Sequence, residues 1–106
     1  MVMENIAFKM KLKPGMKAEY IKRHAEIWPE LKQLLIDTGV SDYTIFLDEE
    51  SNTLFAVQKA SGEEGSQDLG KLDIVQRWWK HMADLMETNP DHSPLIVPLE
   101  KVWHMD

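Results

Sequence analysis

The stretch SDYTIFLDEESNTLFAVQKA, residues 41–60, decides the fold, because it reads as a β-hairpin in the middle of the chain. Its two strand-like runs, residues 41–47 and 53–60, flank the polar turn DEESN. Alternation in the first run places one set of side chains on a single face: Tyr43, Ile45 and Leu47. Helical segments precede and follow the hairpin, so we expect strands from both ends of the chain to complete its sheet.

The helix before the hairpin contains EYIKRHAEIWPELKQLL, residues 19–35, within a predicted span of 16–38 that stops at Gly39. A helical wheel gathers one inward stripe: Tyr20, His24, Ile27, Trp28, Leu31, Leu34 and Leu35. Pro29 removes a backbone donor inside this span, which predicts a kink or a restart near Trp28.

The ends of the chain supply the outer elements. Alternation over residues 6–12 predicts a strand with Ile6, Phe8, Met10 and Leu12 on one face. A second helix is predicted over about residues 68–87, with an apolar stripe of Leu72, Val75, Trp79, Met82 and Met86. This stripe favours Trp79 in the core and Trp78 at a pocket rim, and the simpler interpretation, that both are core residues, remains open. Residues 95–104 predict a last strand, which Pro98 confines to an edge or a bulge.

The resulting order is strand, helix, strand, strand, helix, strand, in a single domain of residues 1–106. It predicts an α+β protein with the ferredoxin-like βαββαβ fold, in which two helices cover one face of a four-stranded antiparallel sheet. The other sheet face is left open. Because a large exposed apolar surface is costly, we expect a second copy of the chain to close it as a homodimer.

Composition restricts the classes of partner. The chain has no cysteine and begins without a secretory signal pattern, so we expect cytoplasmic residence. Its apolar runs are far shorter than the roughly 20 residues that cross a bilayer, which predicts no membrane span. The formal charge of −6, with scattered Lys and Arg, argues against nucleic acid. A neutral or cationic small ligand agrees better with this negative charge than nucleic acid does.

Tyr20 and His24 are four residues apart and are therefore neighbours on one helix surface. A histidine on an apolar stripe is more often a satisfied core residue, and that interpretation remains open. Tyr, His and Trp together suit a carbohydrate, whose C–H face stacks on aromatic rings and whose hydroxyls need donors and acceptors. The histidines have no metal-ligand spacing and the glycines form no phosphate-binding loop, so we expect no metal site and no such loop. The charges flanking His24 read as a solvated helix face with weak pairs.

Five segments together resemble one enzyme family: EYIKRHAEIWPEL, DYTIFLD, LFA, QRWWKHM and NPDHSP. In this order and spacing they are similar to the L-rhamnose mutarotases over nearly the whole chain. The resemblance implies a cofactor-free, dimeric α/β barrel enzyme that interconverts the α and β anomers of L-rhamnopyranose. It implies His24 as proton donor, Tyr20 and Tyr43 as substrate-binding phenols, and Trp78 and Trp79 as the aromatic wall for the sugar.

One segment departs from the family pattern. Family members place a Trp shortly after the acidic pair corresponding to Glu63 and Glu64, where this chain has GSQ, residues 65–67. That departure makes sugar specificity less certain than reaction type. The base that would partner His24 is left open between Tyr43, a carboxylate and a water. Two alternatives also stand: a dimeric α/β-barrel oxygenase, with His24 as a haem ligand or a cofactor-free site, and a non-catalytic sugar-binding module.

Overall fold

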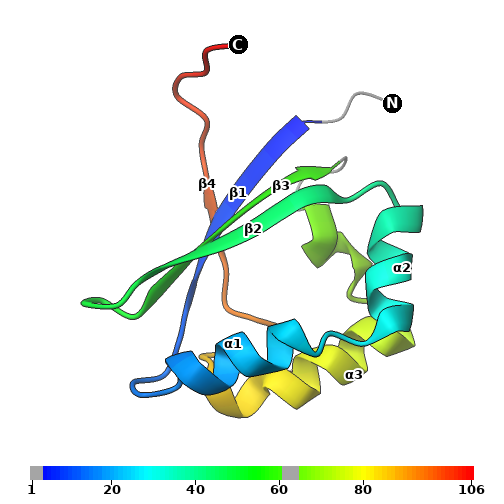
Figure 1. Cartoon of the computed structure of the whole chain (residues 1–106), viewed down its shortest axis with the longest axis vertical. Helices are drawn as coiled ribbons and strands as arrows, with labels where there is room; N and C mark the ends of the chain where they lie inside the picture. Colours follow the sequence, from blue (N-terminus) through cyan, green and yellow to red (C-terminus); the bar gives the residue numbers. More distant parts are fainter. Residues whose placement is uncertain (1–3, 61–64) are drawn as a thin grey trace.

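A computed structural model describes residues 4–60 and 65–106 and contains a four-stranded antiparallel sheet. The elements follow in chain order as β1 (Glu4–Lys11), α1 (Lys17–Ala25), α2 (Pro29–Asp37), β2 (Ser41–Asp48), β3 (Thr53–Ala60), η1 (Gly65–Leu69), α3 (Asp73–Met82), η2 (Ala83–Leu85) and β4 (Val97–Leu99). Figure 1 shows the three α-helices gathered beside the sheet, with the C-terminal end of the chain pointing away from them. The α+β class predicted from the sequence is confirmed.

The strand order is β2-β3-β1-β4, which agrees with a ferredoxin-like arrangement. β1 pairs with β3 along its whole length, from Glu4 opposite Ala60 to Lys11 opposite Thr53. β2 pairs with β3 in an antiparallel register that shifts between Ser41 and Thr44. The predicted hairpin of residues 41–60 is therefore confirmed.

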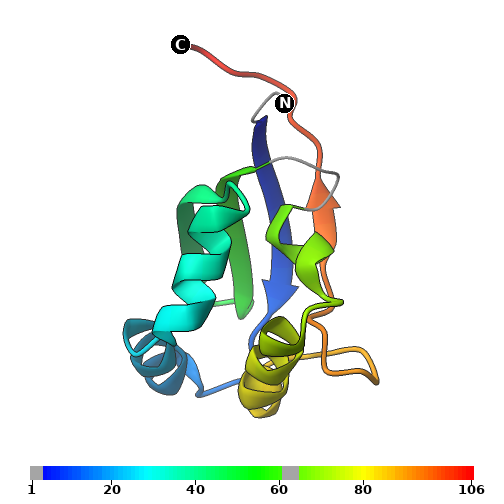
Figure 2. The same ribbon diagram turned by 90° about the vertical axis from the view of Figure 1, so that its right-hand side faces the viewer.

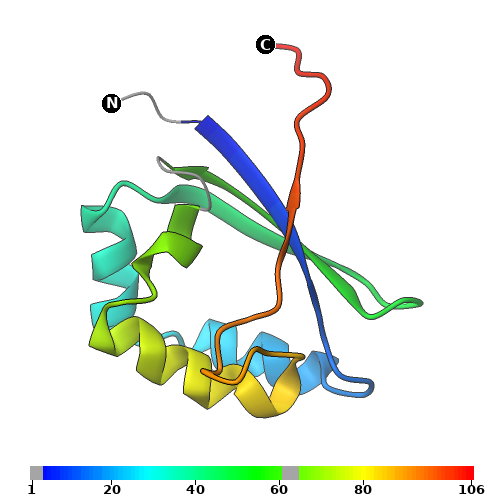
Figure 3. The ribbon, with the colours of Figure 1, turned by 180° about the vertical axis from the view of Figure 1, so that it is seen from behind.

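The helices lie on one face of the sheet, and the hydrophobic core lies between the two layers, as the views of Figures 2 and 3 agree. β1 contributes Phe8 and Met10 to this core, and Leu12 directly follows it, each at most 4% exposed. This confirms the inward alternation predicted for residues 6–12. The opposite sheet face exposes apolar side chains: Phe46, Val57, Val97 and Leu99. That face is the open one expected from the element order.

The predicted break near Trp28 is confirmed. Trp28 is extended, with φ −62° and ψ 129°, and α2 restarts immediately after it with Pro29 in its first turn. Proline suits that position because the first amides of a helix have no partner within the helix. α2 ends at Asp37, and Gly39 takes the left-handed φ of +91°. One predicted helix is thus two helices, α1 and α2.

Two predicted spans are too long. The helix expected over residues 68–87 is α-helical only from Asp73 to Met82, with the short 3₁₀ turns η1 and η2 on either side. Leu72 stands at the helix N-cap and is 39% exposed, so it does not continue the inward stripe. The strand expected over residues 95–104 pairs with β1 only through Val97–Leu99. Pro98 lies opposite Phe8 and has no amide hydrogen to donate there.

Among the helices that the structure describes, none is long and apolar enough to cross a bilayer.

Candidate active site

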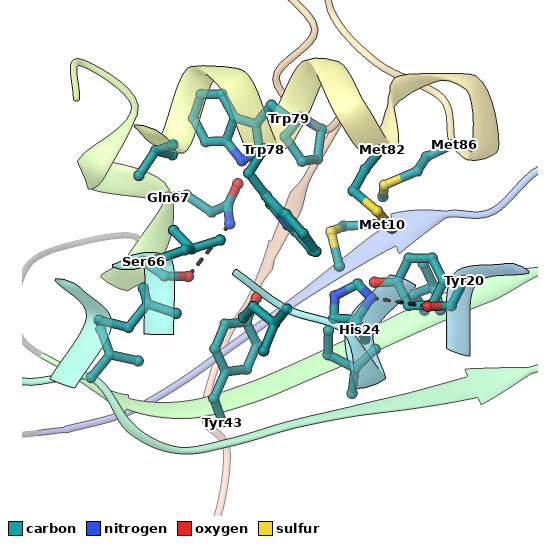
Figure 4. A pocket seen from close by; sticks show the side chains of 18 of the residues that line it. Met10, Tyr20, His24, Tyr43, Ser66, Gln67, Trp78, Trp79, Met82 and Met86 are labelled. Carbon is teal, nitrogen blue, oxygen red and sulfur yellow. Dashed lines mark hydrogen bonds between the residues drawn. The ribbon is translucent and has the colours of Figure 1, made fainter. Parts of the chain in front are cut away.

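A cavity of about 680 Å³ lies between the sheet and the helices. Its lining includes every site residue predicted from the sequence: Tyr20, His24, Tyr43, Trp78 and Trp79. Figure 4 shows these side chains converging from α1, β2 and α3. Segments far apart in the chain therefore line one cavity.

α1 places Tyr20 and His24 side by side, because residues four apart share one face of a helix. Their ring centroids are 4.3 Å apart, with an angle of 31° between the planes. Nδ1 of His24 lies 3.2 Å from the backbone carbonyl oxygen of Tyr20. A carbonyl can only accept, so this contact assigns the proton of the neutral ring to Nδ1. Nε2 of His24 then carries a lone pair.

Burial lowers the pKa of His24 below its ordinary value of 6.5, and the hydrogen bond to the Tyr20 carbonyl offsets only part of this effect. The neutral ring is therefore the main form near neutral pH. Its Nε2 is available to accept a proton, and once protonated the ring becomes an acid strong enough to give the proton back. This histidine suits a reaction that moves a proton in both directions.

The two phenols are both kept protonated by their surroundings. Burial is the main cause that raises the pKa of Tyr20, and the nearby Tyr43 adds charge repulsion. Burial also raises the pKa of Tyr43, while hydrogen bonds from Ser66 and Gln58 oppose the rise. Both hydroxyls thus serve as neutral hydrogen-bonding groups in an otherwise apolar cavity.

Trp78 forms the middle of the aromatic cluster. Its ring centroid is 5.6 Å from that of His24 and 5.2 Å from that of Trp28, with interplanar angles of 87° and 84°. Such edge-to-face contacts are the favoured arrangement for aromatic pairs. His81 packs at 5.5 Å from both indoles, so the cluster joins α3 to the break between α1 and α2.

The predicted roles of the two adjacent tryptophans are reversed. Trp78 is the core residue, at 9% exposed, and Trp79 is only half-buried. The inward stripe of α3 runs through Val75, Trp78 and Met82, with spacings of three and four. The prediction failed because it counted Leu72 into the helix. Both indoles still line the cavity, and a six-membered ring of Trp79 lies against Gly70, where a Cβ atom would come within 2.5 Å.

Arg23 is a functional candidate that the sequence did not reveal. The charges around His24 were predicted to form a solvated face, yet the Arg23 side chain is only 18% exposed. It donates to Glu19 at 2.9 Å and reaches Asp84, 61 residues away, at 2.7 Å. The pair of Arg23 with Glu19, four residues apart, is the local one expected from the sequence, and Asp84 on η2 is a second partner that the sequence did not indicate.

Gln58 and Ser66 were also not predicted from the sequence as residues near the site. Gln58 is fully buried on β3 and Ser66 is 6% exposed on η1. One signal was available: Gln58 interrupts the inward apolar series Leu54, Ala56 and Ala60. Glu63 and Glu64, which mark the departure from the family pattern, lie outside the described residues.

The cavity combines polar groups with apolar and aromatic walls. Around His24, apolar and aromatic side chains surround two phenols and the side chains of Ser66 and Gln67, and the lining also includes Lys17, Lys32, Ser41, Asp42 and His92. Such a set can hold a small polyhydroxylated ligand and exchange a proton with it. Within the part of the chain that the structure describes, no group of three His, Asp or Glu side chains is arranged to hold a metal ion.

Comparison with known proteins gives one consistent result. The family model for L-rhamnose mutarotase matches residues 5–105. An L-rhamnose mutarotase of Bacteroides thetaiotaomicron is 64% identical over 104 residues, which are 98% of this chain and 100% of that protein. The L-rhamnose mutarotase of Formosa agariphila is 61% identical over 98% of this chain and 100% of its own length.

A solved structure agrees with the sequence comparison. The crystal structure of an L-rhamnose mutarotase from Formosa agariphila superposes with a TM-score of 0.90 at 57% identity. The match covers 97% of this chain and 99% of that one.

Proposed function

The chain belongs to the L-rhamnose mutarotase family, and we propose on that premise that the cavity between its sheet and helices is the catalytic centre. The protein is an isomerase that interconverts the anomers of L-rhamnose. One observation supports the location of the site: a neutral histidine with an available Nε2 faces an apolar cavity beside two phenols and two indoles.

His24 is the proposed proton carrier. Ring opening breaks the bond between C1 and the ring oxygen; the anomeric hydroxyl loses a proton, C1 becomes a carbonyl, and the ring oxygen gains a proton. Neutral His24 takes the proton of the anomeric hydroxyl at Nε2, while a water molecule gives a proton to the ring oxygen and becomes hydroxide. After the carbonyl turns its other face, the imidazolium of His24 donates its proton to the carbonyl oxygen, and the attacking hydroxyl returns its proton to the hydroxide as the ring recloses. His24 is thus the proton donor of the closing step.

The aromatic residues are proposed to hold the sugar. Trp78 and Trp79 offer indole surfaces for the apolar C–H face of the pyranose. Tyr20 and Tyr43 offer neutral hydroxyls that bond to the sugar oxygens. These contacts come from α1, β2 and α3, so a bound sugar would be fixed in orientation relative to His24.

The whole chain is proposed to work as one domain in a homodimer. The family match spans residues 5–105, and the cavity lining runs from Met10 on β1 to Pro94. On the outer sheet face Phe46 is 60% exposed and Val97 is 51% exposed. A second copy packed on this face would bury these side chains and complete the dimeric α/β barrel.

The direct test is exchange NMR on the anomeric protons of L-rhamnose, with and without the protein. Acceleration by the wild-type protein that is lost in His24→Asn supports the proposed centre. A protein that binds L-rhamnose without changing its exchange rate would instead be the sugar-binding module. The oxygenase alternative is not favoured, since the relatives described above are named as mutarotases over nearly their full length.

A further inference from the structure

Gln58 is a buried polar side chain that needs an explanation. It is 0% exposed and points to the helix side of β3, between Ala56 and Ala60. Burying an amide without partners costs free energy, so an amide in this position is retained only where its hydrogen bonds are made. An apolar side chain would fill the same place without that requirement.

Ser66 satisfies both ends of the Gln58 amide. Nε2 of Gln58 donates to Oγ of Ser66 at 2.9 Å, and the backbone N–H of Ser66 donates to Oε1 of Gln58 at 2.6 Å. We call Gln58, Gly65 and Ser66 the polar corner. Gly65 has a φ of +57°, and a Cβ there would come within 2.1 Å of Oε1 of Gln58. Only glycine fits, so the backbone closes tightly around this pair.

These hydrogen bonds do not use one donor, the hydroxyl hydrogen of Ser66. Oγ of Ser66 accepts from Gln58, and Nε2 of Gln67 also approaches it at 3.4 Å. Oε1 of Gln58 is already taken by the Ser66 amide. The hydroxyl hydrogen of Ser66 makes no hydrogen bond within this pair and is free to be directed to an acceptor outside it.

Tyr43 is the acceptor that we assign to this hydroxyl. Ser66 and Tyr43 line the same cavity, and Figure 4 shows the Tyr43 ring extending from β2 with its hydroxyl toward α3. Hydrogen bonds from Ser66 and Gln58 oppose the rise that burial causes in the pKa of Tyr43, as donors to its oxygen do. A tyrosine whose oxygen accepts from the protein has its own hydrogen free for a ligand.

We propose that Gln58 and Ser66 are positioning residues that fix the Tyr43 hydroxyl as a hydrogen-bond donor to an oxygen of the bound sugar. The inference rests on the proposed function and adds the polar corner to it. His24, on α1, supplies a proton acceptor, and Tyr43, on β2, supplies a donor with a set direction. A bound sugar would thus contact a proton acceptor on α1 and a hydrogen-bond donor on β2.

A double-mutant cycle tests this role, with KM and kcat for anomer exchange of L-rhamnose as readouts. Loss of one hydrogen bond predicts that Ser66→Ala raises KM by about three- to tenfold and leaves kcat within about twofold. Tyr43→Phe raises KM at least as much. Because Ser66 acts through Tyr43, Ser66→Ala adds no further increase in the Tyr43→Phe background. Ser51→Ala, in the remote β2–β3 turn, is the matched control and changes neither constant.

Two outcomes overturn the inference. In an active enzyme, independent effects of Ser66→Ala and Tyr43→Phe that multiply would show that Ser66 does not act through Tyr43. An unchanged KM in Ser66→Ala would show that it has no role in binding. If Ser66→Ala fails to fold, Ser66→Cys keeps a side chain of similar size, replaces the hydroxyl by a weak donor and allows the same cycle with Tyr43→Phe. A wild-type protein that does not accelerate exchange would instead contradict the proposed function itself.

Discussion

Arg23 and Asp84 form a two-point ion pair, with Nη1 to Oδ1 at 2.7 Å and Nη2 to Oδ2 at 3.2 Å. The same guanidinium donates to the backbone carbonyl of His81 at 2.6 Å and to Glu19 at 2.9 Å. Arg23 thereby ties α1, which carries His24, to the end of α3, which carries Trp78. The edge contact between His24 and Trp78 joins the same two helices.

Arg23→Ala is expected to lower the free energy of unfolding by about 1–2 kcal/mol, because it removes a two-point pair that is only partly exposed. Urea denaturation measures this change. Arg77→Ala is the matched control: Arg77 pairs with Asp73 at 2.9 Å, but both side chains are exposed, and the expected loss is below about 0.5 kcal/mol. Equal losses in the two variants would mean that Arg23 is an ordinary surface residue.

His24→Asn is expected to separate binding from catalysis. Asparagine keeps a donor for the Tyr20 carbonyl but cannot carry the proton, so anomer exchange should fall by about 10²- to 10⁴-fold. L-Rhamnose binding and the melting temperature should stay close to those of the wild-type protein. His104→Asn, at an exposed position near the end of the chain, serves as control. Exchange at the wild-type rate in folded His24→Asn would falsify the assignment.

The pH dependence of exchange should report His24. Because burial lowers its pKa below 6.5, kcat/KM should be level through neutral pH and fall as the pH drops through the lowered value. Protonation favours the unfolded state, where the pKa is higher, so this group also reduces stability as the pH falls below about 6.5. His24→Asn should lack that contribution to the stability profile. An acid limb centred above pH 6.5 would contradict the burial of a neutral ring.

The two tryptophans should differ in stability. Trp78→Ala removes a core side chain that touches His24, Trp28 and His81, with an expected loss of about 3–5 kcal/mol. Trp79→Ala removes a half-buried ring, so it should cost less stability and mainly weaken sugar binding. Thermal melting and L-rhamnose titration of both variants measure the two effects. Greater destabilisation by Trp79→Ala would restore the order predicted from the sequence.

The homodimer is tested by placing a charge on the uncovered sheet face. Light scattering at micromolar concentration should give twice the chain mass for the wild-type protein and a lower mass for Val57→Glu, since Val57 lies on the outer face of β3. Leu72→Glu, at the N-cap of α3 on the helical layer, is a control of similar exposure that should keep the dimer. A wild-type monomer with full activity would contradict this proposal.

Local patterns predicted most of the fold. The alternation in residues 6–12 and 41–60 gave the strands, because inward side chains recur every second residue. Pro29 predicted the helix break, because a residue without an amide hydrogen is well tolerated only in the first turn of a helix. The four-residue spacing of Tyr20 and His24 also sufficed to predict that these two side chains are neighbours.

The remaining features depend on contacts between distant segments. Arg23 pairs with Asp84, which is 61 residues away in the sequence. No local pattern around either residue predicts this pair. Trp78 and Trp79 differ by about 100° around one helix, so an error over where α3 begins exchanged their predicted roles. The pairing of Gln58 with Ser66 needs the close approach of η1 to β3, which only the folded backbone supplies.

The tight fit at Gly65 also constrains how this protein can evolve. Any side chain at position 65 would collide with the Gln58 amide, so a lineage that gains a larger residue there must shorten or replace Gln58 as well. Neither step is neutral alone, because losing Gln58 first leaves Ser66 without its partner. Positions 58, 65 and 66 should therefore change as a group between descendants.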